Sequence, residues 1–472
     1  MDTIVSFFLN DKPVRIPPGT SPTMTLLDWL RGPGRLTGTK EGCAEGDCGA
    51  CTVVLERHGR RMPVNACLLL LGQLHRRRVR TVEGLGGAHP AQTLMAESDG
   101  TQCGFCTPGI VMSLYAHAQE GGDPHEALAG NLCRCTGYRP ILDAIARLPP
   151  EPPSCGQDEA PPAARFETAD QVFHLPNRLA DLLDLRAADP AAWLLAGGTD
   201  LGLRVSEHRE RPPSVICVQN VPDLSAIESR PEGLVVGAAV PYRDLLALCE
   251  AEAGFEPLRP YLGRLGSRQI RSLGTVGGNL GTASPIGDML PPLVALGARV
   301  RLASRRGERV LPVEEFLLDY RRTALAEDEV ILSVFLPRPP AGRLFVVEKL
   351  SRRHDQDISA VAMAATLDVA DGVVRGARLA FGGMAATARR AEATEAALLG
   401  RPLAEESFAA AAEALRLDFS PLSDWRGSAE YRLAAAGGLL RRLFWRAAAK
   451  DLPHDVMSVP APHAPAFAAG TA

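Results

Sequence analysis

The chain has 472 residues, of which 46% are hydrophobic, and it carries 51 lysine and arginine residues against 55 aspartate and glutamate residues. Its length allows about three domains of roughly 150 residues, and the hydrophobic content is enough to bury a core, which excludes a disordered or fibrous protein. The formal net charge of -4, with no long run of one sign, gives no electrostatic basis for binding nucleic acid or an anionic membrane.

The N-terminal segment MDTIVSFFLNDK lacks the basic and apolar regions of a signal peptide. The chain also lacks a run of about 18 apolar residues that could span a membrane. We therefore expect a cytoplasmic protein, in which thiols stay reduced and clustered cysteines bind metal or serve redox chemistry.

Eight of the 11 cysteines form two sets of four. The first set lies in KEGCAEGDCGACTV and NACL and consists of Cys43, Cys48, Cys51 and Cys67. Its C-x4-C-x2-C spacing with a later fourth cysteine is the plant-type ferredoxin spacing for a 2Fe-2S cluster. Small residues in the loop let backbone N–H groups approach the anionic sulfurs. Strands expected at 4–9, 14–16, 52–56 and 62–67, with a short helix at 25–31, predict a small β-grasp domain.

The second set lies in CGFC and NLCRCTGY and consists of Cys103, Cys106, Cys133 and Cys135. Helices expected at 108–119 and 123–128 would present two cysteines at each of two helix-to-turn corners. Four thiolates suit zinc as well as iron, so the spacing alone leaves a structural zinc site open for this set. Cys155, Cys217 and Cys249 stand alone and are interpreted as buried or incidental thiols.

The runs TGTKEGCAEGDCGACTV, QCGFCTPG and GNLCRCTGY together resemble the iron–sulfur region of the molybdenum-containing hydroxylases, the group of the xanthine dehydrogenases and aldehyde oxidases. The resemblance implies that each set of four cysteines holds one 2Fe-2S cluster, the first in a β-grasp domain and the second in a helical domain. It also weakens the zinc alternative for the second set.

A proline-rich segment at 149–164, PPEPPSCGQDEAPPAA, marks a domain boundary, because such a segment is extended and cannot pair in a sheet. Beyond it, strands expected at 193–196, 214–218 and 233–237 and a helix at 242–250 predict a mixed α/β domain.

Two glycine-rich segments of this domain, WLLAGGTDLGL and SLGTVGGNLGTASPIGDMLPP, could cradle a diphosphate with backbone N–H groups and hydroxyls. Taken alone, a Gly-Gly-Thr turn is also typical of an ordinary tight turn, and neither segment has the G-x-G-x-x-G order of a Rossmann fingerprint. Together, however, the two segments are similar to the FAD-binding domain of the same hydroxylase family, a flavoprotein of the vanillyl-alcohol oxidase type.

This similarity implies which residues lie at the FAD. They are Leu194, Leu195, Ala196, Gly197, Gly198, Thr199, Asp200, Leu201, Leu265, Thr275, Val276, Gly277, Gly278, Asn279, Ser284, Asp288, Ile331 and Lys349. Leu265 departs from the family pattern, since it stands where a phenylalanine commonly stacks on the flavin ring. For Lys349 a solvated surface lysine is the alternative interpretation.

The C-terminal part predicts two strands at 360–369 and 373–381, joined by the hairpin signal Asp371-Gly372, and helices at 388–399, 405–416 and 429–449. It resembles the C-terminal domain of the family's flavin subunit. Four charged residues match a strip beside the nicotinamide site of the family's dehydrogenases: Arg352, Arg353, Asp355 and Asp357. A solvated charged loop is the alternative.

The sequence thus predicts a multidomain α+β protein. It comprises a ferredoxin-like 2Fe-2S domain at 1–85, an all-α 2Fe-2S domain at 86–148, a linker at 149–164, an α/β FAD-binding domain at 165–342, an α+β C-terminal domain at 343–450 and a loose tail at 451–472.

The resemblance implies a partner as well, because the chain contains no counterpart of the family's large molybdenum cofactor domain. We expect that domain on another polypeptide, in a dimer of heterodimers. Fusion of both iron–sulfur domains to the flavin domain is the arrangement of the bacterial xanthine dehydrogenases of this family. The expected function is therefore to pass electrons from xanthine or hypoxanthine oxidised at the partner's molybdenum through two 2Fe-2S clusters to FAD and then to NAD+.

In this interpretation the helical-domain cluster lies nearer molybdenum, and the chain contributes no catalytic acid or base. The substrate and the choice between NAD+ and O2 as final acceptor stay open. Three alternatives remain: the equivalent subunit of an aldehyde or N-heterocycle hydroxylase, a stand-alone ferredoxin–flavin reductase, and a zinc-stabilised binding module.

Overall fold

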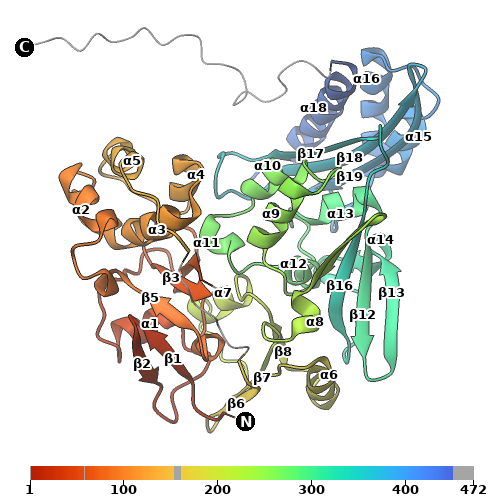
Figure 1. Ribbon diagram of the computed structural model, residues 1–472. Helices are drawn as coiled ribbons and strands as arrows, with labels where there is room; N and C mark the ends of the chain where they lie inside the picture. The colour runs from red at the N-terminus through yellow and green to blue at the C-terminus, as the bar shows by residue number, and fades with distance from the viewer. Residues whose placement is uncertain (1, 58, 154–160, 450–472) are drawn as a thin grey trace, which may run out of the picture.

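The structure, a computed structural model, describes residues 2–57, 59–153 and 161–449. Cys155 and the tail predicted at 451–472 lie outside the described residues. Figure 1 shows the N-terminal regions, red to orange, beside a yellow-to-green region that continues into the blue C-terminal part. Among the residues described, no helix has the length and apolar character needed to cross a membrane.

The N-terminal region is a five-stranded mixed sheet in the order β2-β1-β5-β3-β4. Its strands are β1 (Ser6–Leu9), β2 (Lys12–Arg15), β3 (Thr52–Arg57), β4 (Arg60–Asn65) and β5 (Arg78–Arg80). Helix α1 (Leu26–Arg31) begins where the Thr25 hydroxyl accepts a hydrogen bond from the Asp28 N–H, and it buries Leu26 and Leu30 completely. Short 3-10 turns follow at Leu71–Leu74 and Val82–Leu85. The cysteine-bearing loop 43–51 therefore leads directly into β3.

The next region is helical and comprises α2 (Pro90–Glu97), α3 (Thr107–Glu120), α4 (Pro124–Leu128) and α5 (Arg139–Ala146). Helix α3 is its centre, since every residue from Gly109 to Ala118 is buried. The sequence predicted α3 and α4 but did not predict α2 and α5, which close the apolar core around Ile110 and Leu114.

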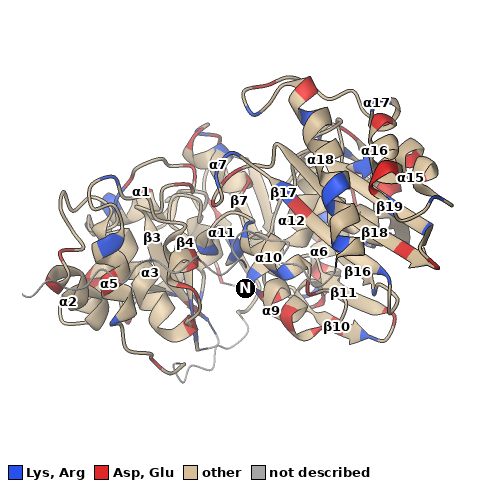
Figure 2. Cartoon of the chain, turned by 90° about the horizontal axis from the view of Figure 1, so that it is seen from above, with Lys and Arg blue, Asp and Glu red and all other residues tan. Residues whose placement is uncertain are grey.

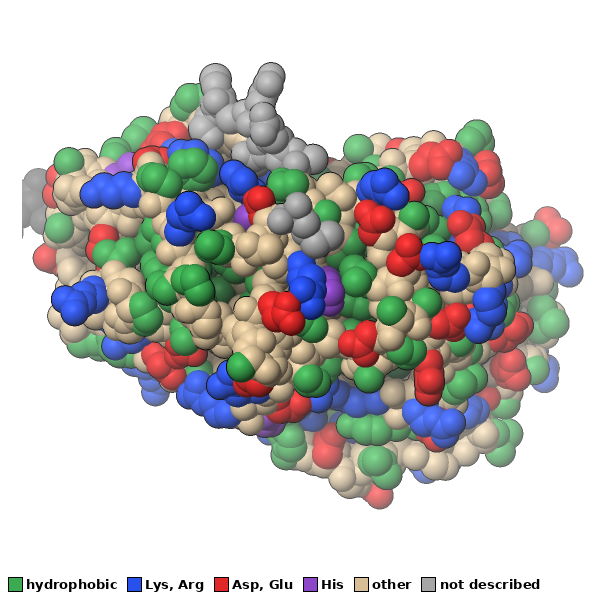
Figure 3. All heavy atoms as spheres, turned by 90° about the horizontal axis from the view of Figure 1, so that it is seen from below, with side chains coloured by type: hydrophobic (Ala, Val, Ile, Leu, Met, Phe, Trp, Pro, Cys, Tyr) green, Lys and Arg blue, Asp and Glu red, His purple; other side chains and the backbone are tan. Residues whose placement is uncertain are grey.

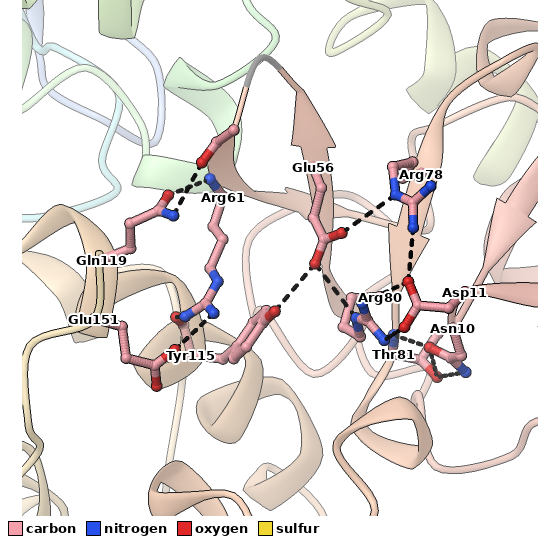
Figure 4. A network of polar contacts seen from close by, with 11 residues as sticks. Asn10, Asp11, Glu56, Arg61, Arg78, Arg80, Thr81, Tyr115, Gln119 and Glu151 are labelled. Carbon is pink, nitrogen blue, oxygen red and sulfur yellow. Dashed lines mark hydrogen bonds and ion pairs between the residues drawn. The ribbon is translucent and has the colours of Figure 1, made fainter. Parts of the chain in front are cut away.

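Polar contacts join the helical region to the β-grasp sheet (Figure 4). Tyr115 of α3 donates its hydroxyl to Glu56 of β3 at 3.0 Å, and Glu56 also pairs with Arg80. Arg61 of β4 lies over the Tyr115 ring, 3.7 Å from its centroid, and binds Glu151 at 2.6 Å. The two regions therefore share one polar interface beside their apolar cores.

The region after residue 161 contains two sheets, in the orders β6-β7-β9-β8 and β10-β11-β16-β12-β13. The first sheet is formed by β6 (Ala164–Glu167), β7 (Val172–Leu175), β8 (Trp193–Leu195) and β9 (Ser214–Cys217). The second sheet is formed by β10 (Ile227–Arg230), β11 (Gly233–Gly237), β12 (Arg299–Ser304), β13 (Gly307–Pro312) and β16 (Val330–Pro337). A small hairpin, β14 (Leu317–Asp319) with β15 (Arg322–Thr323), stands apart from both.

Helices connect these strands and cover them. They are α6 (Leu179–Ala188), α7 (Leu201–Ser206), α8 (Pro222–Ser225), α9 (Tyr242–Ala251), α10 (Leu258–Gly263), α11 (Arg268–Arg271), α12 (Val276–Thr282), α13 (Leu290–Leu296) and α14 (Val313–Phe316). Figures 1 and 2 both place α11 between the N-terminal regions and helices α9 and α10. Helix α11 therefore lies at the boundary of the two halves of the molecule.

The C-terminal region has a sheet in the order β17-β18-β19-β20, with β17 (Leu344–Leu350), β18 (Val361–Ala370), β19 (Val373–Gly382) and β20 (Arg389–Arg390). Helices α15 (Glu392–Leu398), α16 (Glu405–Glu413), α17 (Leu415–Asp418) and α18 (Ala429–Ala448) pack beside it. The predicted start of the helix at 388 was wrong. Arg389 and Arg390 pair with β19 and extend the sheet before the chain turns into α15.

Candidate cofactor sites

The first cysteine set lies in two pairs. The Cys43 N–H donates to Cys48 Sγ at 3.3 Å, and the Cys48 N–H donates to Cys43 Sγ at 3.2 Å. In the second pair, Cys51 Sγ and Cys67 Sγ are 3.4 Å apart in the core of the β-grasp region. Three of the four cysteines thus lie in the loop that precedes β3, and Cys67 lies just after β4.

Hydrogen bonding inside these pairs perturbs their thiols. The contact with Cys48 lowers the pKa of Cys43 to about 5, and the same contact raises the pKa of Cys48. In the buried pair, the hydrogen bond with Cys67 lowers the pKa of Cys51. In each pair the hydrogen bond thus shifts one thiol toward the thiolate, the form of cysteine that binds metal.

The second cysteine set is also paired, with Cys103 beside Cys135 and Cys106 beside Cys133. Burial and the contact with Cys133 raise the pKa of Cys106 to about 12. The Cys133 N–H donates to the Tyr138 hydroxyl at 2.8 Å, and Cys133 Sγ lies 3.2 Å from Thr136 Oγ1. Tyr138 itself has a left-handed φ of 68° and starts α5, which fixes the C-x-C loop against that helix.

This pairing fits a binuclear cluster, because a 2Fe-2S centre has four thiolate ligands divided between two iron atoms. The sulfur pairs of both sets are therefore compatible with the ligand arrangement of a 2Fe-2S centre.

A cavity of about 800 Å³ lies beside the first cysteine loop. It lies where the two glycine-rich segments meet and where the first sheet approaches β16. Most of the residues expected at FAD line it: Leu194, Ala196, Gly197, Gly198, Thr199, Asp200, Leu201, Leu265, Thr275, Gly277, Gly278, Asn279, Ser284, Asp288 and Ile331. Leu195, Val276 and Lys349 do not line it, since Leu195 and Val276 point into apolar cores.

The glycine-rich segments are pressed together at this cavity. A Cβ on Gly197 would collide with the Leu273 carbonyl oxygen, and Gly198 has a φ of 80°, so neither position suits a side chain. Thr275 caps α12 by accepting a hydrogen bond from the Gly278 N–H at 2.9 Å. Asn279 Oδ1 is buried at the cavity wall without a partner among the described residues. Backbone and amide groups of this kind suit a phosphate-bearing nucleotide.

Lys349 lies behind the cavity wall. Its Nζ donates to Asp288 Oδ2 at 2.7 Å and to the Arg264 carbonyl at 3.0 Å, and Asp288 Oδ1 accepts from Ser359 at 2.5 Å. The lysine side chain is only 1% exposed, so the alternative of a solvated surface lysine was wrong. A buried ammonium needs a paired carboxylate. Lys349 has this partner in Asp288, which itself lines the cavity.

Of the four charged residues in the strip, Asp357 lines the cavity, and it accepts from the Arg353 N–H at 2.8 Å. Arg352, Arg353 and Asp355 are exposed and do not line it. Gln356, which the sequence analysis did not single out, lines the cavity and donates to the carbonyls of Asp47 and Ala129, both at 2.8 Å.

Another part of the cavity wall was not predicted. Glu45, Gly46 and Asp47, which lie between the ligand positions Cys43 and Cys48, line the cavity. Ser206 of α7 donates to the Ala44 carbonyl at 2.6 Å, so the cysteine loop is fixed against the flavin-type region. This contact could not be predicted from a local sequence pattern, because the two segments are 162 positions apart.

Comparison with known proteins gives three matching family models. They are described as a [2Fe-2S] binding domain over residues 81–146, an FAD binding domain in molybdopterin dehydrogenase over residues 165–339 and a CO dehydrogenase flavoprotein C-terminal domain over residues 347–447. With the geometry above, these matches define an iron–sulfur flavoprotein.

Two solved structures each resemble more than half of the chain. Carbon monoxide dehydrogenase from Hydrogenophaga pseudoflava is 31% identical with a TM-score of 0.55, and covers 57% of this chain and 94% of its own. Quinoline 2-oxidoreductase from Pseudomonas putida 86 is 28% identical with a TM-score of 0.55, and covers 58% of this chain and 95% of its own.

Among curated proteins, xanthine dehydrogenase/oxidase of Rattus norvegicus is 32% identical over 453 residues, which is 80% of this chain and 34% of the relative. The chain thus spans about a third of the length of the curated relatives it matches. The chain belongs to the molybdenum hydroxylase family and carries its 2Fe-2S, FAD-binding and C-terminal flavoprotein domains. The predicted family and multidomain α+β fold are confirmed.

Proposed function

We propose that the chain is the electron-transfer subunit of a xanthine dehydrogenase. It would take electrons from a purine oxidised at the molybdenum cofactor of a partner subunit and deliver them through two 2Fe-2S clusters and FAD to NAD+. Support for this substrate comes from the xanthine dehydrogenases among the curated relatives, which match both the iron–sulfur and the flavin parts.

One observation carries the electron-transfer proposal. The loop that bears Cys43 and Cys48 also forms a wall of the cavity suited to FAD, through Glu45, Gly46 and Asp47. The first cluster and the flavin would therefore be neighbours. When bound, 2Fe-2S clusters exchange single electrons and FAD exchanges one or two, which lets the flavin collect electrons one at a time and release a pair.

The chain's own residues would hold these groups in fixed positions. Cys43, Cys48, Cys51 and Cys67 would bind the first cluster, and Cys103, Cys106, Cys133 and Cys135 the second. The glycine-rich turns would cradle the diphosphate of FAD, while Leu265 and Ile331 offer apolar surface and Asp288, held by Lys349 and Ser359, offers an oriented carboxylate. We also propose that the strip formed by Arg352, Arg353, Asp355 and Asp357 lies near bound NAD+.

The second cysteine set supports a partner subunit. Cys103 and Cys135 are exposed, and so are the apolar neighbours Phe105 and Leu132, at 48% and 53%. An exposed cluster beside apolar side chains suits a protein that docks there and exchanges electrons. We propose that the partner is a molybdenum-cofactor subunit, in an assembly of two copies of each chain in the cytoplasm. We also propose domains at 1–85, 86–148, 165–342 and 343–450, with a linker at 149–164.

The test is co-purification with a tag on this chain, followed by determination of iron, FAD and molybdenum and an assay of xanthine with NAD+. Cys43→Ser and Cys133→Ser should each remove one cluster and leave FAD bound. Xanthine-dependent NADH formation by the purified complex would support the proposal, and a complex with intact cofactors that is inert toward purines would contradict the substrate assignment.

A second candidate is the corresponding subunit of another molybdenum hydroxylase. The resemblance of more than half of the chain to carbon monoxide dehydrogenase and quinoline 2-oxidoreductase favours it. A partner complex that oxidises an aldehyde or an N-heterocycle, but not xanthine, would establish this alternative.

A further inference from the structure

The two cysteine loops touch each other through their backbones at three glycines, which we call the glycine junction: Gly49, Gly109 and Gly130. A Cβ on Gly49 would collide with the Gly130 carbonyl oxygen, and a Cβ on Gly109 would collide with the Gly49 carbonyl oxygen. Gly49 stands between Cys48 and Cys51, and Gly130 stands three positions before Cys133. The segments that carry the two proposed clusters therefore meet without intervening side chains.

Hydrogen bonds reinforce this contact. The Leu132 N–H donates to the Cys48 carbonyl at 2.9 Å. Leu132 directly precedes Cys133, so this bond links the segments that carry two of the proposed ligands. Asn131 adds a second bond, since its Nδ2 donates to the Gly49 carbonyl at 3.0 Å. The relative position of the two loops is thus fixed by directional bonds as well as by packing.

A side chain of the flavin-type region reaches into this contact. Gln269 of α11 is 1% exposed, and its Nε2 lies 3.1 Å from Asn131 Oδ1 and 3.2 Å from Thr52 Oγ1. Thr52 directly follows Cys51, and Asn131 lies two positions before Cys133. A Cβ on Gly130 would collide with Gln269 Oε1, so the glutamine fills the space that this glycine leaves.

The network is closed on the helical side by Ser113 of α3. Its hydroxyl donates to Asn131 Oδ1 at 2.6 Å and lies 3.3 Å from Gln269 Nε2. Gln269, Asn131, Ser113 and Thr52 are all at most 3% exposed. Buried polar side chains that bond one another favour a single arrangement, because an arrangement that breaks these bonds leaves further polar atoms without partners.

Helix α11 also belongs to the cavity that suits FAD. Ile270 on the helix and Leu265 and Thr275 on either side of it line that cavity. The same short segment therefore contacts both cysteine loops and shapes the flavin-type cavity. Arg268 and Arg271 hold it in place by pairing with Glu126 of α4 at 3.2 and 2.6 Å.

We propose that Gln269 is a positioning residue through which the flavin-binding region sets the relative position of the two iron–sulfur clusters. This inference rests on the proposed function, since it assumes a cluster on each cysteine set. It adds that the coupling between the clusters depends on a residue that binds neither of them.

The test is Gln269→Met in the complete, anaerobically purified protein. Methionine keeps the length and burial of the side chain but cannot donate to Asn131 or Thr52. We expect iron and FAD to be retained, and the magnetic splitting between the two reduced clusters, seen by electron paramagnetic resonance, to decrease. Electron exchange between the clusters and the flavin should slow in the same variant.

Gln171→Met is the matched control. Gln171 is also buried and also joins the two halves of the molecule, because its Nε2 donates to Thr23 at 2.8 Å and to the Pro212 carbonyl at 3.0 Å. The side-chain hydrogen bonds of Gln171 go to Ser21, Thr23 and Pro212, which lie outside the cysteine loops. We expect this variant to lose stability and to keep the wild-type splitting.

Unchanged splitting in Gln269→Met, or an equal change in Gln171→Met, would overturn the inference. If Gln269→Met does not fold, Ser113→Ala decides: a smaller splitting supports the inference, and the wild-type splitting overturns it. Wild-type protein that shows no pair of iron–sulfur signals would instead overturn the proposed function, so the two failures are distinguishable.

Discussion

The two cysteine sets have the same paired geometry but different surroundings. Cys51 and Cys67 are 2% and 1% exposed within the β-grasp core, whereas Cys103 and Cys135 are exposed at the surface of the helical region. Solvent exposure and hydrogen bonding to the sulfurs are among the factors that set the reduction potential of such clusters. The two cysteine sets thus have different surroundings: the residues between Cys43 and Cys48 line the flavin-type cavity, whereas Cys103 and Cys135 of the second set are exposed.

The two cysteine-bearing regions differ in the burial of their cysteines but not in the charge of the surface around them. Basic and acidic residues are interspersed along the chain in Figure 2, and their side chains are interspersed on the face seen in Figure 3. The difference between the two sets therefore depends on burial and local apolar neighbours rather than on a one-signed field.

The largest effects, on cluster content and on stability, are expected from comparing Cys67→Ser with Cys135→Ser. Each should remove the cluster of its own set, with half of the iron lost and the other cluster retained. Cys67→Ser should also lower the stability of the metal-free protein by about 1–3 kcal/mol, because it buries a hydroxyl in the β-grasp core. Cys135→Ser should leave that stability within about 0.5 kcal/mol.

Iron determination and urea unfolding of the metal-free variants provide the measurements. Equal stability losses in Cys67→Ser and Cys135→Ser would contradict the difference in burial.

The next largest effect distinguishes the backbones of the two loops. Gly49 and Gly137 have nearly the same left-handed φ, 66° and 65°, but a Cβ on Gly49 would meet the Gly130 carbonyl, whereas nothing lies within 4 Å of a Cβ on Gly137. Gly137→Ala should cost about 1–2 kcal/mol from backbone strain alone. Gly49→Ala should cost an additional amount of about 1–3 kcal/mol from overpacking.

Thermal unfolding with a fixed cofactor load compares these two variants. Similar melting temperatures for Gly49→Ala and Gly137→Ala would be incompatible with close contact between the loops.

A smaller effect is expected at the interface between the β-grasp and helical regions. Tyr115→Phe removes the hydroxyl that donates to Glu56 and should lower the free energy of unfolding by about 1.5–3 kcal/mol, the range for a hydrogen bond to a charged group. Tyr431, which is 49% exposed, provides the control, and Tyr431→Phe should be nearly neutral. A neutral Tyr115→Phe in urea titrations would argue against this interface.

Much of this could be predicted from the sequence where the signal is local. The two cysteine motifs, the glycine-rich turns and the Asp371-Gly372 hairpin are short-range patterns, and the structure has β18 and β19 on either side of that hairpin. Helices α2 and α5 were not predicted, because their short apolar patterns become clear only where they pack on α3.

Long-range contacts could not be predicted from one sequence. Lys349 and Asp288 are 61 positions apart, and the burial of a lysine cannot be inferred without its partner carboxylate. The same holds for Gln269, whose bonding partners Thr52 and Asn131 are 217 and 138 positions away. The cavity wall formed by Glu45, Gly46 and Asp47 likewise needs the packing of two regions.

The smallest expected effect is a pH dependence of stability. Burial lowers the pKa of His75, His89, His117 and His174 below the ordinary value of 6.5. The folded protein then binds fewer protons than the unfolded chain, so stability falls as the pH drops below about 6.5 and the loss ends below the folded pKa values. Three of these histidines belong to the two cysteine-bearing regions, which should lose stability first.

Melting curves between about pH 7.5 and pH 5.5, with iron–sulfur absorbance and flavin fluorescence as separate probes, measure this dependence. A melting temperature that rises as the solution is acidified in this interval would contradict the buried, neutral state of these histidines.

The most direct test of the central claim is the cofactor content of the anaerobically purified protein, taken together with its paramagnetic signals after reduction. Two paired cysteine sets and one flavin cavity predict four iron atoms, one FAD and two distinct iron–sulfur signals per chain. A preparation with zinc in place of iron, or with a single iron–sulfur signal and two iron atoms at full FAD occupancy, would contradict the account.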